Sequence, residues 1–121
     1  MDESLKSVKS FLIKSKQLIS QEKYNLVGGR SKNKSFMERH GLTKKDVVRI
    51  VQNLHTRHRV AGPEEEESAN HSLGTIFIFI KKETIDDQMV EIYIKLKISD
   101  EEEMLIILSC HESYEEDYCY E

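Results

Sequence analysis

The chain has 121 residues, 38% of them hydrophobic and 33% charged, with a formal net charge of −4. This length predicts a single domain, residues 1–121, and long Ile, Leu and Val runs exclude a wholly disordered protein. No stretch is apolar enough to span a membrane, the start does not resemble a secretory signal, and two cysteines are too few for a disulfide framework, so we expect a cytoplasmic protein with reduced thiols and no membrane partner.

Residues 1–61 form a basic part in which we expect helices. They hold fourteen Lys/Arg and five Asp/Glu, a net charge of +9. Apolar residues at helical spacing predict a first helix over residues 3–20, and the run from Tyr24 to Val27 is typical of a short strand. A cationic segment attracts phosphodiester backbones, so nucleic acid is a candidate partner. The charges could instead be solvated and attract the acidic half within the fold.

Two further helices are expected in the basic part. The first covers residues 35–40 and ends at Gly41, a residue that readily adopts the left-handed stop. The second follows Thr43, whose spacing to Asp46 is that of a capping box, and should end near residues 54–56.

Residues 62–121 are acidic, with four Lys/Arg against seventeen Asp/Glu, a net charge of −13. We predict an exposed acidic loop over residues 62–72 and an acidic tail over residues 112–121. Between them, residues 73–111 should form an antiparallel three-stranded meander, with strands at residues 75–81, 89–98 and 104–111 and turns at residues 86–87 and 99–102. The fold class is therefore α+β, with N-terminal helices packed on a mostly antiparallel sheet.

The middle strand of the meander alternates between apolar and polar residues. Val90 to Ile98 supply an apolar residue at every even position, whereas Tyr93, Lys95 and Lys97 share the other face. On the next strand, Ser109 and His111 are the polar positions of an otherwise apolar run. We therefore expect one buried face and one wet face.

The register between these two strands decides whether the polar residues meet. If Tyr93 lies opposite Ser109, then Glu91 lies opposite His111, and Tyr93, Lys95, Ser109 and His111 converge on one exposed patch. This register needs a loop of odd length. A loop of two or four residues would bring Tyr93 level with Leu108 instead, and would put the two polar sets on opposite faces.

Such a patch has the groups that metal-independent RNA cleavage needs, because the ribose 2′-hydroxyl attacks its own phosphodiester once it is deprotonated. His111 would transfer the proton, Lys95 would stabilise charge on the phosphoryl oxygens, and Tyr93 would stack on a base or donate a hydrogen bond. No cofactor or metal is expected. The alternative is that these residues only solvate the outer face of a sheet.

The order and spacing of several short motifs resemble those of the MqsR family, over about residues 8–112. The matching pieces are Phe11-Leu12, Tyr24 to Val27, Arg30, Lys32-Asn33, Gly41-Leu42-Thr43, Asp46, Leu54, Gly62-Pro63-Glu64, Ile76 to Phe79, Tyr93-Ile94-Lys95-Leu96 and Ser109-Cys110-His111-Glu112.

This resemblance implies a RelE-like fold and the toxin of a bacterial type II toxin–antitoxin system. Such a toxin is an mRNA interferase, an endoribonuclease that cleaves mRNA and is neutralised by a cognate antitoxin protein. By this resemblance Tyr93 matches a tyrosine that the family carries on a strand, and Lys95 matches the lysine two residues further on. His111 occupies the position at which the founding enzyme has a lysine. Arg30 and Lys32 match the family's basic segment before the second helix.

The remaining candidate residues are judged from their surroundings in the sequence. Arg57 and Arg59 could bind RNA phosphates or could cap the negative end of the preceding helix. Lys97 and Ser109, on the polar faces of their strands, are further candidates for RNA binding. Cys110 is not expected to act with His111, because adjacent residues on a strand point to opposite faces. The alternatives to a ribonuclease are a non-catalytic module that binds nucleic acid or protein, and a structural partner of a basic protein.

Overall fold

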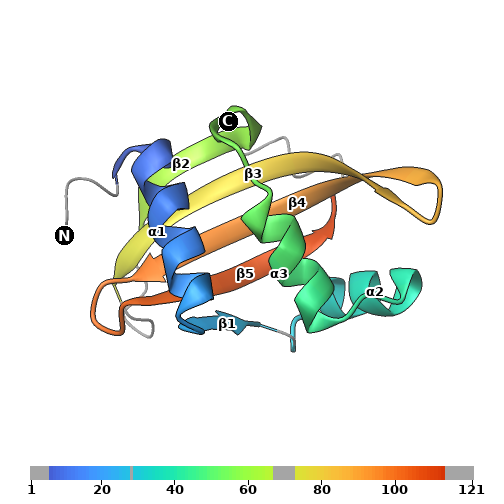
Figure 1. Ribbon diagram of the computed structural model, residues 1–121, viewed down its shortest axis with the longest axis horizontal. Helices are drawn as coiled ribbons and strands as arrows, with labels where there is room; N and C mark the ends of the chain where they lie inside the picture. The colour runs from blue at the N-terminus through green and yellow to red at the C-terminus, as the bar shows by residue number, and fades with distance from the viewer. Residues whose placement is uncertain (1–5, 28, 67–72, 114–121) are drawn as a thin grey trace.

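The chain is an α+β protein in which three helices precede most of a five-stranded sheet (Figure 1). The computed structural model describes residues 6–27, 29–66 and 73–113. The elements are α1 (Val8–Ser20), β1 (Tyr24–Leu26), α2 (Ser31–His40), α3 (Lys44–Gln52), η2 (Thr56–His58), β2 (Arg59–Glu65), β3 (Gly74–Ile85), β4 (Gln88–Ser99) and β5 (Met104–Glu112). The predicted fold class, with its C-terminal meander, is confirmed. Residues 67–72 of the predicted acidic loop and 114–121 of the acidic tail lie outside the described residues.

The start of α3 and the end of α2 are set by residues that suit helix termini. Thr43 and Asp46 form the predicted capping box of α3, with Asp46 N 3.3 Å from Thr43 Oγ1 and Thr43 N 2.8 Å from Asp46 Oδ2. Gly41 ends α2 in the left-handed conformation, as its position predicted. The second helix nevertheless begins at Ser31, four residues earlier than expected, because Asn33 makes buried contacts that the sequence pattern does not reveal.

The sheet has the strand order β1-β5-β4-β3-β2, with β1 parallel to β5 and the other pairs antiparallel. The predicted turn at Asp86 and Asp87 joins β3 to β4, with φ angles of 50° and 65°. Two left-handed residues in a two-residue loop match the right-handed twist of the paired strands. The predicted meander of β3, β4 and β5 is therefore present, and β1 and β2 form the edges.

Residues 62–65 belong to a strand, so the prediction of a loop starting at residue 62 is wrong for this stretch. β2 pairs with β3 through an irregular register in which Ala61 lies opposite Ile78 and Glu64 opposite Ile76. Gly62 has a φ of 105°, and a Cβ there would come within 2.7 Å of the Ile76 carbonyl oxygen. Glycine permits this close approach, and an edge strand tolerates Pro63 because its outer side needs no amide donor.

The helices cover one face of the sheet (Figure 1). The rings of Phe11 on α1 and Phe77 on β3 lie 4.7 Å apart between centroids, and the even-numbered apolar residues of β4 join the same core. The predicted alternation of β4 is therefore confirmed for its apolar face. Tyr93, Lys95 and their neighbours occupy the opposite face, which we call the second face. No helix in the described ranges is long and apolar enough to cross a membrane.

Candidate functional site

A bulge in β5 places four polar side chains on the second face. The loop between β4 and β5 has four residues, Asp100 to Glu103, and Ser99 lies opposite Met104, which by itself would put the polar sets on opposite faces. The register shifts by one residue between the pairs Leu96–Ile107 and Lys95–Ser109, so Leu108 has no direct partner on β4. Beyond the bulge Lys95 lies opposite Ser109, and Tyr93 lies opposite His111.

These pairs share a face as the ribonuclease hypothesis requires, but by a different route from the one expected. The loop length is even rather than odd, and Tyr93 meets His111 rather than Ser109. An extra residue in one strand switches the face to which each later side chain of that strand points. The bulge therefore offsets the even length of the loop and brings Ser109 and His111 to the face of Tyr93 and Lys95.

Asn33 holds the bulge in place from α2. Its side-chain nitrogen donates to the carbonyl oxygens of Val27 at 2.8 Å and Leu108 at 3.0 Å, and its oxygen accepts from the backbone N–H of Cys110 at 3.0 Å. Asn33 is only 1% exposed. A bulge leaves backbone groups that the neighbouring strand cannot pair, and this one amide satisfies two of them while tying β5 to the end of β1.

The rings of Tyr93 and His111 stack at 5.2 Å between centroids and at an angle of 19°. His111 Nδ1 lies 2.8 Å from the carbonyl oxygen of Glu112. A carbonyl oxygen only accepts hydrogen bonds, so Nδ1 carries the proton and, in the neutral ring, Nε2 carries the basic lone pair. The strand thus fixes both the plane and the tautomer of the imidazole.

The backbone that orients His111 is itself anchored to α2. The Glu112 carboxylate accepts from His40 Nε2 at 3.0 Å and from Arg39 at 2.9 Å. The hydrogen bond from His40 and, to a lesser extent, the one from Arg39 hold the pKa of Glu112 below its usual range. Glu112 therefore remains a carboxylate at neutral pH and keeps the end of β5 against the helix.

Tyr93, Lys95, Ser109 and His111 form what we call the polar row. Arg30 brings a guanidinium to its Ser109 end. Its Nη1 donates to Ser109 Oγ at 3.3 Å, and Ser109 lies opposite Lys95. Arg30 is exposed and Lys95 is half-buried. Among the predicted residues, the structure thus brings together Tyr93, Lys95, Ser109, His111 and Arg30.

The expectation of a wet, exposed patch is wrong for most of the second face. Tyr93 is 5% exposed, Ser109 5%, His111 4% and Lys97 3%. The Lys97 ammonium lies 3.1 Å from a carboxylate oxygen of Glu66, so this lysine is engaged in a buried ion pair rather than turned to solvent. The sequence pattern showed which side chains are polar, but it carried no information on their hydrogen-bonding and ionic partners.

The other predicted RNA-binding residues lie on α2, η2 and β2. Lys32 is exposed on the first turn of α2, and Arg59 Nη1 donates to the Gly62 carbonyl at 3.0 Å. Arg57 lines a hollow of about 370 Å³ that also includes His58, Val60, Ile80, Lys82 and Glu91.

This hollow adjoins the stacked rings of Tyr93 and His111, which we call the ring pair, because Ile80 on β3 lies directly opposite Tyr93 on β4. His58, the neighbour of Arg57 in η2, brings a ring to it, and Lys82, which the sequence did not point to, brings a further cation. Burial and then the charge of Arg57 lower the pKa of His58, so its ring is neutral at physiological pH. No spacing in the sequence connects η2 with β3, so only the fold could reveal this hollow.

Cys110 lies on the helix-covered face and takes no part in the site. It belongs to the core, whereas His111 stacks on Tyr93 across the sheet. Burial raises the pKa of its thiol to about 12. The thiol is therefore protonated and turned away from the imidazole, which agrees with the expectation that the two residues do not act together.

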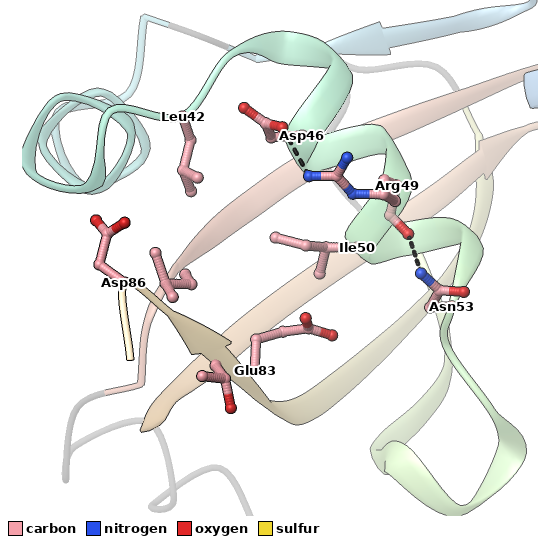
Figure 2. A pocket seen from close by; sticks show the side chains of 9 residues that line it. Leu42, Asp46, Arg49, Ile50, Asn53, Glu83 and Asp86 are labelled. Carbon is pink, nitrogen blue, oxygen red and sulfur yellow. Dashed lines mark hydrogen bonds and ion pairs between the residues drawn. The ribbon is translucent and has the colours of Figure 1, made fainter. Parts of the chain in front are cut away.

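A second polar hollow, of about 240 Å³, lies between α3 and the β3–β4 hairpin (Figure 2). Figure 2 shows Asp46 directed toward Arg49, whose guanidinium lies 2.7 Å from Asp46 Oδ1, and Asn53 bonded to the Arg49 carbonyl. Asp46 also caps α3 and Glu83 pairs with Lys81. These groups stabilise the helix and the hairpin, and within the described residues no cluster of His, Cys, Asp and Glu is arranged to hold a metal ion.

Comparison with protein-family models, curated proteins and solved structures finds no match to this chain. The resemblance to the MqsR family and the RelE-like fold therefore stay predictions from the sequence. The polar row of the second face is the candidate site on its geometry alone.

Proposed function

We propose that the chain is a metal-independent endoribonuclease that cleaves single-stranded mRNA, acting in the cytoplasm as the toxin of a toxin–antitoxin pair. The observation that supports the chemistry best is the pairing of Tyr93 with His111 and of Lys95 with Ser109 beyond the bulge. An imidazole of fixed tautomer and an ammonium on neighbouring positions are suited to moving a proton and stabilising a phosphoryl charge.

In the proposed reaction, His111 Nε2 accepts the proton of the ribose 2′-hydroxyl. The 2′-oxygen then attacks the adjacent phosphorus, the bond to the 5′-oxygen breaks, and the leaving oxygen takes a proton from solvent. The products are a 2′,3′-cyclic phosphate and a 5′-hydroxyl. Lys95 stabilises the charge on the phosphoryl oxygens, the Tyr93 ring holds the imidazole, and Arg30 binds the neighbouring phosphate.

The burial of the ring pair sets a condition on this reaction. Arg30 is exposed and Lys95 half-buried, whereas Tyr93 and His111 are 5% and 4% exposed. RNA should therefore meet Arg30 and Lys95 first, and cleavage should require a change that exposes the imidazole. The same burial favours a second candidate, a non-catalytic module that binds nucleic acid or protein through its cationic residues.

The test is a defined single-stranded RNA incubated with purified protein in the presence of a chelator. We expect discrete cuts that disappear in Lys95→Ala and His111→Gln, with circular dichroism showing that both variants are folded. Lys9→Ala, which removes an exposed lysine on α1, is the matched control and should cut normally. RNA that is bound but stays uncut by the wild-type chain would support the binding module instead.

A further inference from the structure

An apolar groove lies at the β1 edge of the molecule, away from the polar row. Its floor is made by Leu26 on β1, Met37 on α2 and Leu42 in the turn between α2 and α3, and its volume is about 650 Å³. The three side chains belong to the border of the core, where they are partly buried. We call this feature the β1 groove. It offers room for one or two aliphatic side chains from another molecule.

The backbone beside the groove can accept another strand. The Lys23 carbonyl and the Val27 N–H bond to β5, at 3.0 and 3.1 Å. Backbone groups of successive residues in a strand point to opposite sides, so the N–H and C=O groups of Tyr24 and Leu26 point to the outer edge. β1 is the last strand of the sheet on this side. Such an edge is a template for an added strand.

The rim of the groove is mainly cationic. Lys34 and Lys44 stand on it, and Glu38 is the one carboxylate among the residues that line it. The Lys44 ammonium lies 5.2 Å from the centroid of the Tyr24 ring, which keeps this charge close to the strand. Within residues 6–27, 29–66 and 73–113, Lys34 has no ion pair. The rim therefore selects for negative charge.

We propose that the β1 groove binds an extended segment of a partner protein in which acidic residues flank an aliphatic side chain. The aliphatic side chain fills the space between Leu26, Met37 and Leu42, the carboxylates face Lys34 and Lys44, and the main chain pairs with the outer edge of β1. A second copy of this chain is a poor occupant, because two identical cationic rims would repel each other. RNA is also a poor occupant, because it cannot continue a backbone ladder. This surface is separate from the proposed cleavage site.

The test uses a fluorescein-labelled heptapeptide, Glu-Val-Glu-Leu-Glu-Val-Glu, with Lys in place of each Glu as the control peptide. We expect the acidic peptide to raise the fluorescence anisotropy of the mixture and to shift the amide resonances of Tyr24 and Leu26, and the Lys peptide to do neither. The double variant Lys34→Glu/Lys44→Glu should weaken binding of the acidic peptide by about tenfold or more and should bind the Lys peptide instead.

The matched variant Lys9→Glu/Lys16→Glu, which reverses two exposed charges on α1, should leave both affinities unchanged. Equal loss of binding in this control pair, or amide shifts confined to other elements, would overturn the proposal. So would competition by single-stranded RNA at equal concentration. RNA cleavage should be unaffected by the Lys34→Glu/Lys44→Glu change, so failure here is separable from failure of the ribonuclease proposal.

Discussion

Replacing Asn33 with alanine tests how the bulge is held. The change removes the partners of three backbone groups, the carbonyls of Val27 and Leu108 and the N–H of Cys110, at a position that is 1% exposed. Each hydrogen bond contributes about 0.5–1.5 kcal/mol, and a buried group left without a partner costs more, so we expect a loss of about 2–4 kcal/mol in the free energy of unfolding. That is a large share of the roughly 5–15 kcal/mol of a typical domain.

The isosteric change Asn33→Asp separates hydrogen bonding from packing. The introduced carboxylate can accept from the Cys110 N–H but cannot donate to Val27 and Leu108, and burial raises its pKa above the unfolded value. A group whose pKa is raised in the folded state contributes most below its unfolded pKa and loses that contribution as pH rises through the folded pKa. The destabilisation relative to wild type should thus be larger at pH about 7 than at pH about 4.

Urea unfolding measures both changes, with Asn53→Ala as the control. Asn53 is exposed and its side chain donates to the nearby Arg49 carbonyl, so its replacement should change the free energy of unfolding by about 0.5 kcal/mol or less. Nuclear Overhauser effects between the rings of Tyr93 and His111 report the register directly. If Asn33→Ala unfolds at the wild-type urea concentration and keeps those effects, Asn33 does not hold the bulge.

Three further experiments test the cap of α3, the burial of Cys110 and the ion pair of Lys97. Thr43→Ala should cost about 1 kcal/mol in urea unfolding, because it removes the side-chain cap of α3. Hydrogen bonds from Thr43 lower the pKa of Asp46, so the stabilisation by Asp46 is present above its unfolded pKa and is lost as pH falls through the folded pKa. Asp46→Asn should therefore destabilise the chain at neutral pH, and this loss should shrink as the pH of the urea unfolding experiment is lowered. Iodoacetamide at pH about 8 should leave Cys110 unmodified in the native chain, since its pKa is about 12, and peptide mapping that finds it labelled would contradict the burial. Glu66→Ala should destabilise the chain by about 1.5–3 kcal/mol, because the Lys97 ammonium loses a charge-assisted hydrogen bond. Adding Lys97→Met should restore part of the loss in a double-mutant cycle, and additive losses would show that the pair is not coupled.

The features that the sequence predicted are those set by neighbouring residues. The alternation of Val90 to Ile98 follows from the two-residue period of a strand, and the Asp86-Asp87 turn follows from residues that tolerate left-handed φ. The capping box of Thr43 is likewise written within four residues. Local chemistry decides each of these, and the structure confirms them.

The features that the sequence did not predict depend on distant residues. The run from Leu105 to Cys110 is almost uniformly apolar, and nothing in it marks Leu108 as the extra residue. The bulge is bonded to Asn33, which lies 75 residues from Leu108 in the chain. Lys32-Asn33 is one of the motifs that resemble the MqsR family, but nothing near it in the sequence points to β5. The burial of Tyr93 and His111 likewise could not follow from their polar character.

The most direct test of the proposed chemistry uses an RNA that carries a single 2′-deoxyribose at a mapped cut site. If His111 activates the 2′-hydroxyl, the unmodified RNA should yield a 2′,3′-cyclic phosphate in the presence of chelator, and the modified RNA should stay intact at that site alone. Cutting that persists at the 2′-deoxy position, or products that end in a 3′-hydroxyl, would contradict attack by the ribose and remove the role proposed for the stacked imidazole.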